Sequence, residues 1–252
     1  MFNIRQLVRG LGLLLSGTLL VSAIVFAEAR HTGRTCQGIE IEMDEAAQHL
    51  IQKEALLTLL TADASKPILA APLHSLDARS IENTVKTHNF VREGIVYKNW
   101  RGTLKIAVLA RRPIARILYP NRQSRYIDED GALLPLSDQH TARVLLIEAE
   151  NWSKGGKNLR EHADGAALLT LLNYIDQDPL WRAQIAYLHV NEKGKVTMTT
   201  QVSKQHIEFG RPEVVDKKFA KLRLFYKQVI PYKGWNTYKR VNLEFDNQIV
   251  CE

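Results

Sequence analysis

The chain has 252 residues, of which 45% are hydrophobic and 24% are charged, and it carries a net charge of +7. This composition is typical of a globular protein with one or two cores, and it excludes a wholly disordered chain. A basic chain can bind nucleic acid or an anionic membrane. However, its positive charge is scattered, and the densest group has the spacing of a solvated helix face, with no zinc-finger or RNP pattern beside it. That group is Lys217, Lys218, Lys221, Arg223 and Lys227.

The N-terminal region contains an apolar stretch with no charged side chain from residue 11 to residue 27. Extended to residues 7–27, it approaches the ~20 residues that span a bilayer as a helix. Arg5 and Arg9 precede the uncharged stretch, so the positive-inside rule predicts a cytoplasmic tail at residues 1–6 and the rest of the chain outside the cytoplasm. A cleaved signal peptide is the alternative, because Ala27-Glu28-Ala29 has the small-x-small pattern of a cleavage site.

Residues 36–112 have the pattern of a small α/β domain. Residues 39–43 alternate as a half-buried strand, and Asp44 then occupies an N-cap position before one amphipathic helix over residues 45–60. Asp77 is the N-cap of a second helix that runs to about residue 88.

A hairpin completes this domain. Its two strands are predicted at residues 91–98 and 104–108, and the turn at residues 99–102 ends in Gly102, which tolerates positive φ. The predicted order is therefore strand, helix, helix, strand, strand.

Residues 113–252 predict a β-rich domain with flanking helices. A helix is predicted at residues 163–175, ending before Pro179. The Asp128–Gly131 segment is interpreted as an Asp-Gly hairpin turn; a calcium loop would need more carboxylates in register. Strands are predicted at residues 114–119, 123–127, 132–136, 143–149, 184–190, 195–201 and 207–209.

The clearest helix follows Gly210, with Pro212 expected in its first turn. Its buried face is predicted from the spacing of Val215, Phe219, Leu222 and Tyr226, and it should end near Pro231. Residues 238–251 then predict one or two final strands. A terminal strand can offer unpaired N–H and C=O groups to another protein.

The chain contains no HExxH, G-x-S-x-G or glycine-rich phosphate loop, and Gly155-Gly156-Lys157 lacks the rest of a Walker pattern. Cys36 and Cys251 match no metal motif, and their spacing alone does not predict a disulfide. The sequence therefore predicts no catalytic site, cofactor or metal. Carboxylates that converge in space keep an extracytoplasmic enzyme as the alternative.

Three stretches together resemble the FtsQ/DivIB family, in the versions found in Bacteroidetes. The first runs from Ser80 to Arg116 and includes Arg111-Arg112-Pro113-Ile114. The second is Tyr126–Gly131 with Leu134-Pro135-Leu136. The third joins Ile207–Gly210 and the following helix to the end of the chain at Val241–Cys251.

The resemblance implies an α+β fold: a single transmembrane helix at residues 7–27, a POTRA-type β-α-α-β-β domain at 36–112, and a mixed β domain at 113–252. It implies a non-enzymatic scaffold in the cell inner membrane, with a cytoplasmic N-terminus and a periplasmic bulk. The POTRA domain would help to recruit the protein to the division site and would contact upstream divisome proteins. The β domain would bind FtsB/FtsL-type proteins by β-augmentation and link them to septal peptidoglycan synthesis.

The partner-binding residues implied by the resemblance are Glu244, Phe245, Asp246, Asn247, Gln248, Ile249 and Val250. The alternative is an ordinary terminal hairpin with its apolar members in the core. No nucleic acid or small-molecule substrate is expected. A POTRA-bearing envelope assembly or secretion factor is a further alternative, although about 140 residues with two helices do not suffice for a β-barrel.

Overall fold

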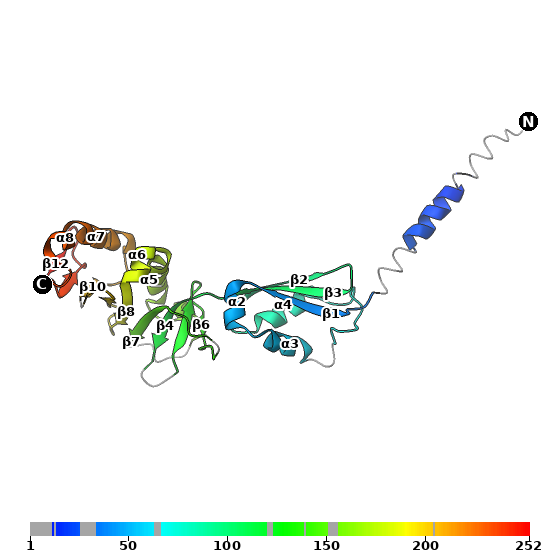
Figure 1. Cartoon of the computed structure of the whole chain (residues 1–252), viewed down its shortest axis with the longest axis horizontal. Coiled ribbons are helices and arrows are strands. Elements are labelled where there is room, and N and C mark those ends of the chain that lie inside the picture. Colours follow the sequence, from blue (N-terminus) through cyan, green and yellow to red (C-terminus); the bar gives the residue numbers. More distant parts are fainter. Residues whose placement is uncertain are drawn as a thin grey trace, which may run out of the picture. The chain divides into compact units, whose positions relative to one another are not determined.

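The computed structural model describes residues 12, 14–25, 34–62, 67–119, 123–138, 140–150, 156–203 and 205–252. The chain divides into two compact units, Met1–Ala110 and Arg111–Glu252 (Figure 1). The predicted cytoplasmic tail lies outside the described residues. Of the predicted transmembrane segment, residues 12 and 14–25 are described, and they are helical. Within the described parts of the chain, no helix combines the length and the apolar character that a membrane crossing requires.

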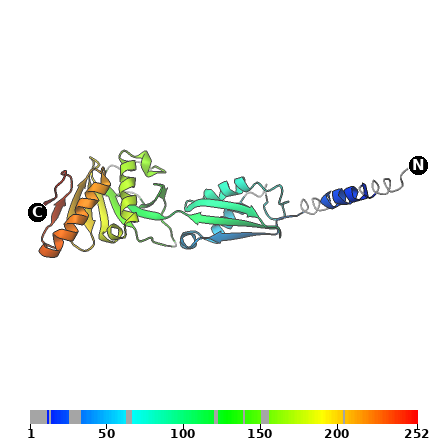
Figure 2. The same cartoon turned by 90° about the horizontal axis from the view of Figure 1, so that it is seen from above.

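The first unit is a three-stranded sheet with helices packed on it. The sheet order is β1-β3-β2, with β1 parallel and β2 antiparallel to β3, and Figure 2 shows the strands lying side by side. Its core includes Leu56, Val85, Leu104 and Ile106, all fully buried. Its elements are β1 (Gly38–Met43), α2 (Glu45–Leu50), α3 (Lys53–Thr61), α4 (Ala78–Lys86), β2 (Val91–Lys98) and β3 (Thr103–Ala110).

Two of the predicted helix starts are confirmed by their caps. The Asp44 carboxylate accepts a hydrogen bond from the Ala47 N–H at 2.8 Å, and the Asp77 carboxylate accepts one from the Arg79 N–H at 3.0 Å. Each bond satisfies one of the N–H groups that a first helical turn leaves without an intrahelical partner.

The prediction of one continuous helix over residues 45–60 is wrong. Ile51 has an extended backbone, with φ of −128° and ψ of 127°, and separates α2 from α3. Its side chain is 3% exposed. Leaving the helix at this point lets Ile51 reach the core, and burial of its apolar side chain favours the break.

The second unit contains one nine-stranded mixed sheet in the order β12-β11-β10-β9-β8-β7-β4-β5-β6. Helices α5, α6, α7 and α8 all lie on one side of this sheet (Figure 1). Its elements are β4 (Pro113–Leu118), β5 (Arg125–Asp128), β6 (Leu133–Leu134), β7 (Leu145–Ala149), the 3₁₀ helix η1 (Leu159–Glu161), α5 (Gly165–Gln177), α6 (Pro179–Gln184), β8 (Ile185–Val190), β9 (Val196–Thr200), β10 (His206–Gly210), α7 (Val215–Gln228), α8 (Ile230–Lys233), β11 (Arg240–Asn242) and β12 (Val250–Cys251).

An aromatic cluster fills the space between these helices and the sheet. The Phe219 ring of α7 lies 4.8 Å from the rings of Tyr174 and Trp181 and 5.3 Å from that of Phe209, measured between centroids. Helix α6, which carries Trp181, was not predicted. The predicted end of the preceding helix before Pro179 is confirmed, because α5 ends at Gln177. Pro179 then begins α6, and Asp178 caps it by accepting from the Leu180 N–H at 2.9 Å.

The predicted Asp-Gly turn is confirmed at the end of β5. The buried Asp128 carboxylate accepts from the N–H groups of Asp130 and Ala132 at 3.0 and 2.7 Å and from Arg111 Nη1 at 2.7 Å. Gly131 has a φ of +86°, which a residue with a Cβ rarely adopts. The carboxylate thus holds the turn and neutralises an arginine.

Helix α7 begins later than expected. Pro212 lies before the N-cap residue Val214, so its placement in the first helical turn is wrong. The predicted apolar face is correct: Val215, Phe219 and Leu222 are buried and Tyr226 is half-buried.

Candidate partner-binding edge

The final strand β12 forms one edge of the nine-stranded sheet. It pairs antiparallel with β11, in the register Val241↔Cys251 and Asn242↔Val250. Arg240 and Glu252 exchange both of their backbone hydrogen bonds, at 3.0 Å each. Because bonded and non-bonded residues alternate in an antiparallel pair, the Cys251 N–H and C=O point away from β11 toward the outer edge.

The predicted partner-binding residues lie beside this edge but do not form one strand. Val250 belongs to β12, whereas residues 244–249 lie in the loop between β11 and β12. The prediction of one or two final strands over residues 238–251 is confirmed as two short strands, β11 and β12, and these six residues form the connection between them. Phe245 and Val250 are 48% and 37% exposed, while Ile249 packs against the core.

Lys221 on α7 explains why this segment is a loop. Its Nζ donates to the carbonyl oxygens of Leu243, Phe245 and Gln248, at 3.0, 2.6 and 3.4 Å. An ammonium group that donates to three carbonyls satisfies acceptors that lie outside the β11–β12 ladder, and it therefore stabilises the loop. The basic face of α7, expected to be solvated, therefore has a structural role at this position.

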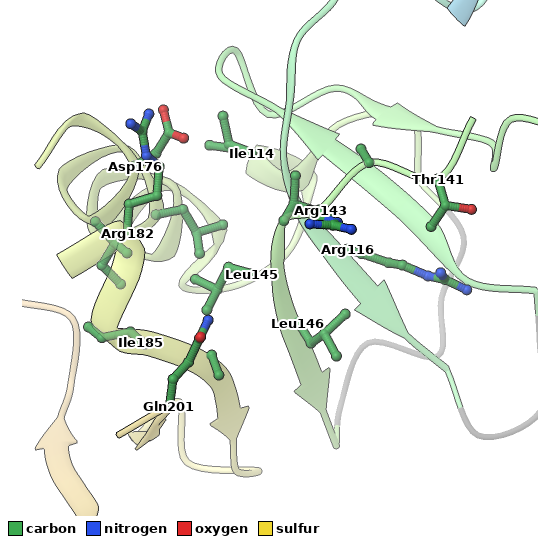
Figure 3. Close-up of a pocket in the computed structure, with 15 residues that line it drawn as sticks. Ile114, Arg116, Thr141, Arg143, Leu145, Leu146, Asp176, Arg182, Ile185 and Gln201 are labelled. Carbon is green, nitrogen blue, oxygen red and sulfur yellow. The ribbon is translucent and has the colours of Figure 1, made fainter. Parts of the chain in front are cut away.

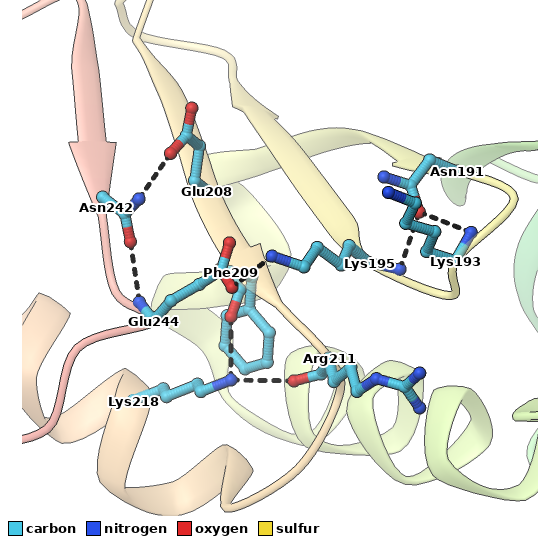
Figure 4. Close-up of polar contacts among 9 residues, drawn as sticks. All are labelled: Asn191, Lys193, Lys195, Glu208, Phe209, Arg211, Lys218, Asn242 and Glu244. Carbon is cyan, nitrogen blue, oxygen red and sulfur yellow. Dashed lines mark hydrogen bonds and ion pairs between the residues drawn. The ribbon is translucent and has the colours of Figure 1, made fainter.

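Asn242 fixes the start of the same loop (Figure 4). Its side chain donates to Glu208 at 2.5 Å and accepts from the Glu244 N–H at 2.8 Å. The Glu244 carboxylate then pairs with Lys195 Nζ at 2.7 Å. The start of the loop is thus attached to β10 and to Lys195, the residue before β9, so Phe245 is presented from an ordered frame.

Lys218, also on α7, resembles Lys221 in donating to backbone carbonyl oxygens (Figure 4). Its Nζ donates to the carbonyl oxygens of Phe209 and Arg211, each at 2.8 Å, and lies 4.8 Å from the centre of the Phe209 ring. Burial lowers the pKa of this ammonium group. Burial also raises the pKa of the Cys251 thiol, which keeps the thiol at the sheet edge neutral.

A hollow of about 450 Å³ lies between α7 and the loop. Its walls include Leu224, Phe225, Val229, Tyr238 and Ile249. Leu224 is 52% exposed, although it lies among the basic residues of α7. The sequence interpretation missed both Leu224 and Lys221. A leucine on an otherwise basic helix face was the signal that could have identified this surface.

Another hollow, of about 440 Å³, lies where the parallel strands β4, β7 and β8 begin (Figure 3). Three arginines line it, Arg116, Arg143 and Arg182. Its carboxylate, Asp176, is bound at 2.7 Å by Arg112. The lining therefore offers a cationic surface and no pair of carboxylates for acid–base chemistry. Within the described chain, no group of three or more His, Cys, Asp or Glu side chains is arranged to hold a metal ion.

The chain thus combines a small helix-backed sheet with a β domain that ends in an open sheet edge. Residues 34–109 match the POTRA-like domain, and residues 112–252 match the family described as FtsQ/DivIB, C-terminal related. The second match covers more than half of the chain, so the protein belongs to the FtsQ/DivIB family.

A curated relative agrees with this assignment. The cell division protein FtsQ of Rhodothermus marinus is 29% identical over 185 residues, which cover 71% of this chain and 67% of that protein. Membership of the family supports a scaffold role in cell division.

Proposed function

We propose that this protein is a non-enzymatic divisome scaffold that binds FtsB/FtsL-type proteins through the open edge at β12 and links them to septal peptidoglycan synthesis. The observation that carries the proposal is the combination of an unpaired sheet edge with an anchored loop that exposes Phe245. The partner-binding residues are Glu244, Phe245, Asp246, Asn247, Gln248, Ile249 and Val250.

The binding mode is β-augmentation. A partner strand adds to β12 and forms main-chain hydrogen bonds with the outward N–H and C=O of Cys251. Phe245 and the hollow beside α7 contact the partner's apolar side chains, which provides selectivity. Lys221 and Asn242 act as positioning residues, because they hold the loop without facing the partner strand.

The protein is a single-pass protein of the cell inner membrane. The apolar segment at residues 7–27 is the anchor, residues 1–6 are cytoplasmic, and the domains at 36–112 and 113–252 are periplasmic. The arginines before the uncharged stretch and the family's role in division support this topology. The POTRA-like domain takes part in recruiting the protein to the division site.

The test is capture of the periplasmic parts of the cognate FtsB–FtsL pair by the detergent-solubilised full chain. The Phe245→Ala, Val250→Lys double variant should weaken capture at least about tenfold, since central apolar contacts dominate such interfaces. The matched control is Val202→Ala, Leu146→Lys, which changes two other exposed apolar side chains of the β domain and should bind normally.

If the wild-type chain captures neither protein, the proposed partners are wrong. If the wild type and both folded variants capture the pair equally, the partners stand and the proposed edge is wrong. Thermal unfolding of each variant shows whether it is folded.

A further inference from the structure

The turn between β2 and β3 carries an exposed tryptophan. Trp100 is 69% exposed, and it lies at the tip of the hairpin formed by the longest strands of the first unit. A tryptophan in water leaves a large apolar surface hydrated, and such residues are characteristic of binding surfaces and of membrane interfaces.

Positive side chains surround this tryptophan. The Arg101 guanidinium lies 4.9 Å from the centre of the Trp100 ring, and Arg34 Nη1 donates to the Trp100 carbonyl at 2.7 Å. Lys98 ends the preceding strand. A hollow of about 360 Å³ at this tip is lined by Arg34, Thr35, Gln37, Trp100, Arg101 and Gly102, none of which is acidic.

Farther along the same sheet, the positive charge of Lys105 is neutralised. Lys105 on β3 pairs with Glu40 and Glu42 on β1, at 3.3 and 2.9 Å. Among the described residues at the tip, no carboxylate forms an ion pair with Arg34 or Arg101. The tip thus keeps a net positive charge, which attracts anions.

The tip is held in a fixed conformation. Gly102 has a φ of +89°, and a Cβ at this position would lie 3.1 Å from the Thr35 carbonyl oxygen. The Gln37 N–H donates to the Gly102 carbonyl at 2.8 Å, so the turn is bonded to the segment that precedes β1. Trp100 and Arg34 are therefore presented together.

Chain length limits how far this tip can be from the N-terminal apolar segment. Nine Cα–Cα steps (34 minus 25) separate Val25, the last described residue of the N-terminal helix, from Arg34. A fully extended chain covers at most about 30 Å in that number of steps. An anchor embedded in a bilayer would therefore keep Arg34 and its neighbour Trp100 within this distance of the point where the chain leaves the bilayer.

We infer that the tip formed by Arg34, Lys98, Trp100 and Arg101 binds the surface of the anionic membrane in which the chain is anchored. The guanidinium and ammonium groups contact lipid phosphates, and the Trp100 indole lies at the level of the headgroups. This inference rests on the membrane anchoring in the proposed function. It adds a lipid contact that orients the first unit on the bilayer.

The test uses the full chain reconstituted in vesicles of phosphatidylcholine with or without phosphatidylglycerol, with a spin-labelled lipid that quenches tryptophan near the headgroups. The chain has four tryptophans, so the Trp100 signal is the difference between the wild type and Trp100→Phe. We expect this signal to be quenched in vesicles that contain phosphatidylglycerol.

Two charge variants sharpen the result. Arg34→Gln, Arg101→Gln should reduce the quenching of Trp100 at least about threefold, because both arginines contribute to the attraction toward an anionic surface. The matched control, Lys53→Gln, Lys86→Gln, removes the same charge from exposed positions on α3 and α4 and should leave the quenching unchanged. Arg101→Gln alone keeps the Arg34 bond to the turn and should give an intermediate value.

The outcomes separate the tip from the anchor. Vesicle flotation first reports whether the chain is membrane-bound: a chain that does not float overturns both the anchoring and the lipid contact. A chain that floats while Trp100 is not quenched leaves the anchoring intact and overturns the lipid contact. If Trp100 emission responds to inorganic phosphate in detergent but shows no quenching in vesicles, the site takes a free anion and the inference is wrong.

Discussion

The two edges of the nine-stranded sheet differ in how they are closed. At β6, Leu133 and Leu134 are buried, the Leu133 N–H donates to the Lys157 carbonyl at 2.9 Å, and Ala132 forms a bridge with Asn158. At β12, Val250 is 37% exposed, and within the described chain no strand lies beyond it.

An exposed edge invites pairing with other chains, and natural proteins usually cover it. This protein covers one edge with its own chain and holds a loop in position beside the other. The contrast supports the proposal that the β12 edge is a binding surface. Four substitutions test whether the two edges differ in this way.

The largest expected effect is at the closed edge. Asp128→Ala should lower the free energy of unfolding by about 3 kcal/mol, because it leaves a partly buried Arg111 and two turn N–H groups without their acceptor. Urea denaturation measures the change. Asp246→Ala, at the open edge, is the control and should change stability by less than about 0.5 kcal/mol; equal losses would contradict the comparison.

The next effect is on partner binding at the open edge. Cys251→Pro removes the N–H that faces outward and should weaken capture of the FtsB–FtsL pair about thirtyfold, or roughly 2 kcal/mol. An edge strand tolerates proline when its N–H faces away from the sheet, so the thermal unfolding temperature should fall by only a few degrees. Unchanged capture by the folded variant would show that no strand pairs with β12.

A smaller effect is expected at the positioning residue Lys221. Lys221→Met removes three contacts to carbonyl oxygens and should cost about 1–2 kcal/mol, with faster hydrogen exchange at residues 243–250 in the unbound protein. Lys217→Met, on the exposed side of the same helix, is the matched control. Exchange rates that match those of this control would show that the loop is ordered without Lys221.

The smallest effect concerns the ion pair between Lys195 and Glu244. Both side chains are partly exposed, so Glu244→Gln should cost roughly 0.5 kcal/mol, and the difference from wild type should shrink as salt is added. Stability measured at low and high salt tests this. A loss above about 1.5 kcal/mol would mean that Glu244 supports the loop through more than this pair.

Local sequence patterns were sufficient for several elements. The caps at Asp44 and Asp77, the turn at Gly102 and the buried face of α7 each depend on residues within a few positions of one another. Short-range hydrogen bonds and helical periodicity dominate there, so the local sequence determines the conformation.

The candidate site was only partly predictable. The resemblance directed attention to residues 244–250, of which residues 244–249 lie in the loop between the two final strands. Lys221 lies more than twenty residues earlier in the sequence, and no local pattern pairs a helix lysine with three distant carbonyl oxygens. Leu224 was a recognisable signal in the sequence, because it is an apolar residue among the lysines and arginine of α7. The sequence interpretation grouped this face by its positive charge and so overlooked it.

The sequence by itself determined the caps at Asp44 and Asp77, the turns at Gly102 and Gly131, and the family resemblance, because these depend on neighbouring residues or on the pattern along the whole chain. The tertiary structure decided three further features. The helix breaks at Ile51 because that side chain reaches the core; α6 forms where Trp181 packs against Phe219; and the final strand is short because Lys221 holds the loop before it. Each depends on contacts between residues distant in the sequence, whose energies exceed the local preference for a continuous helix or strand.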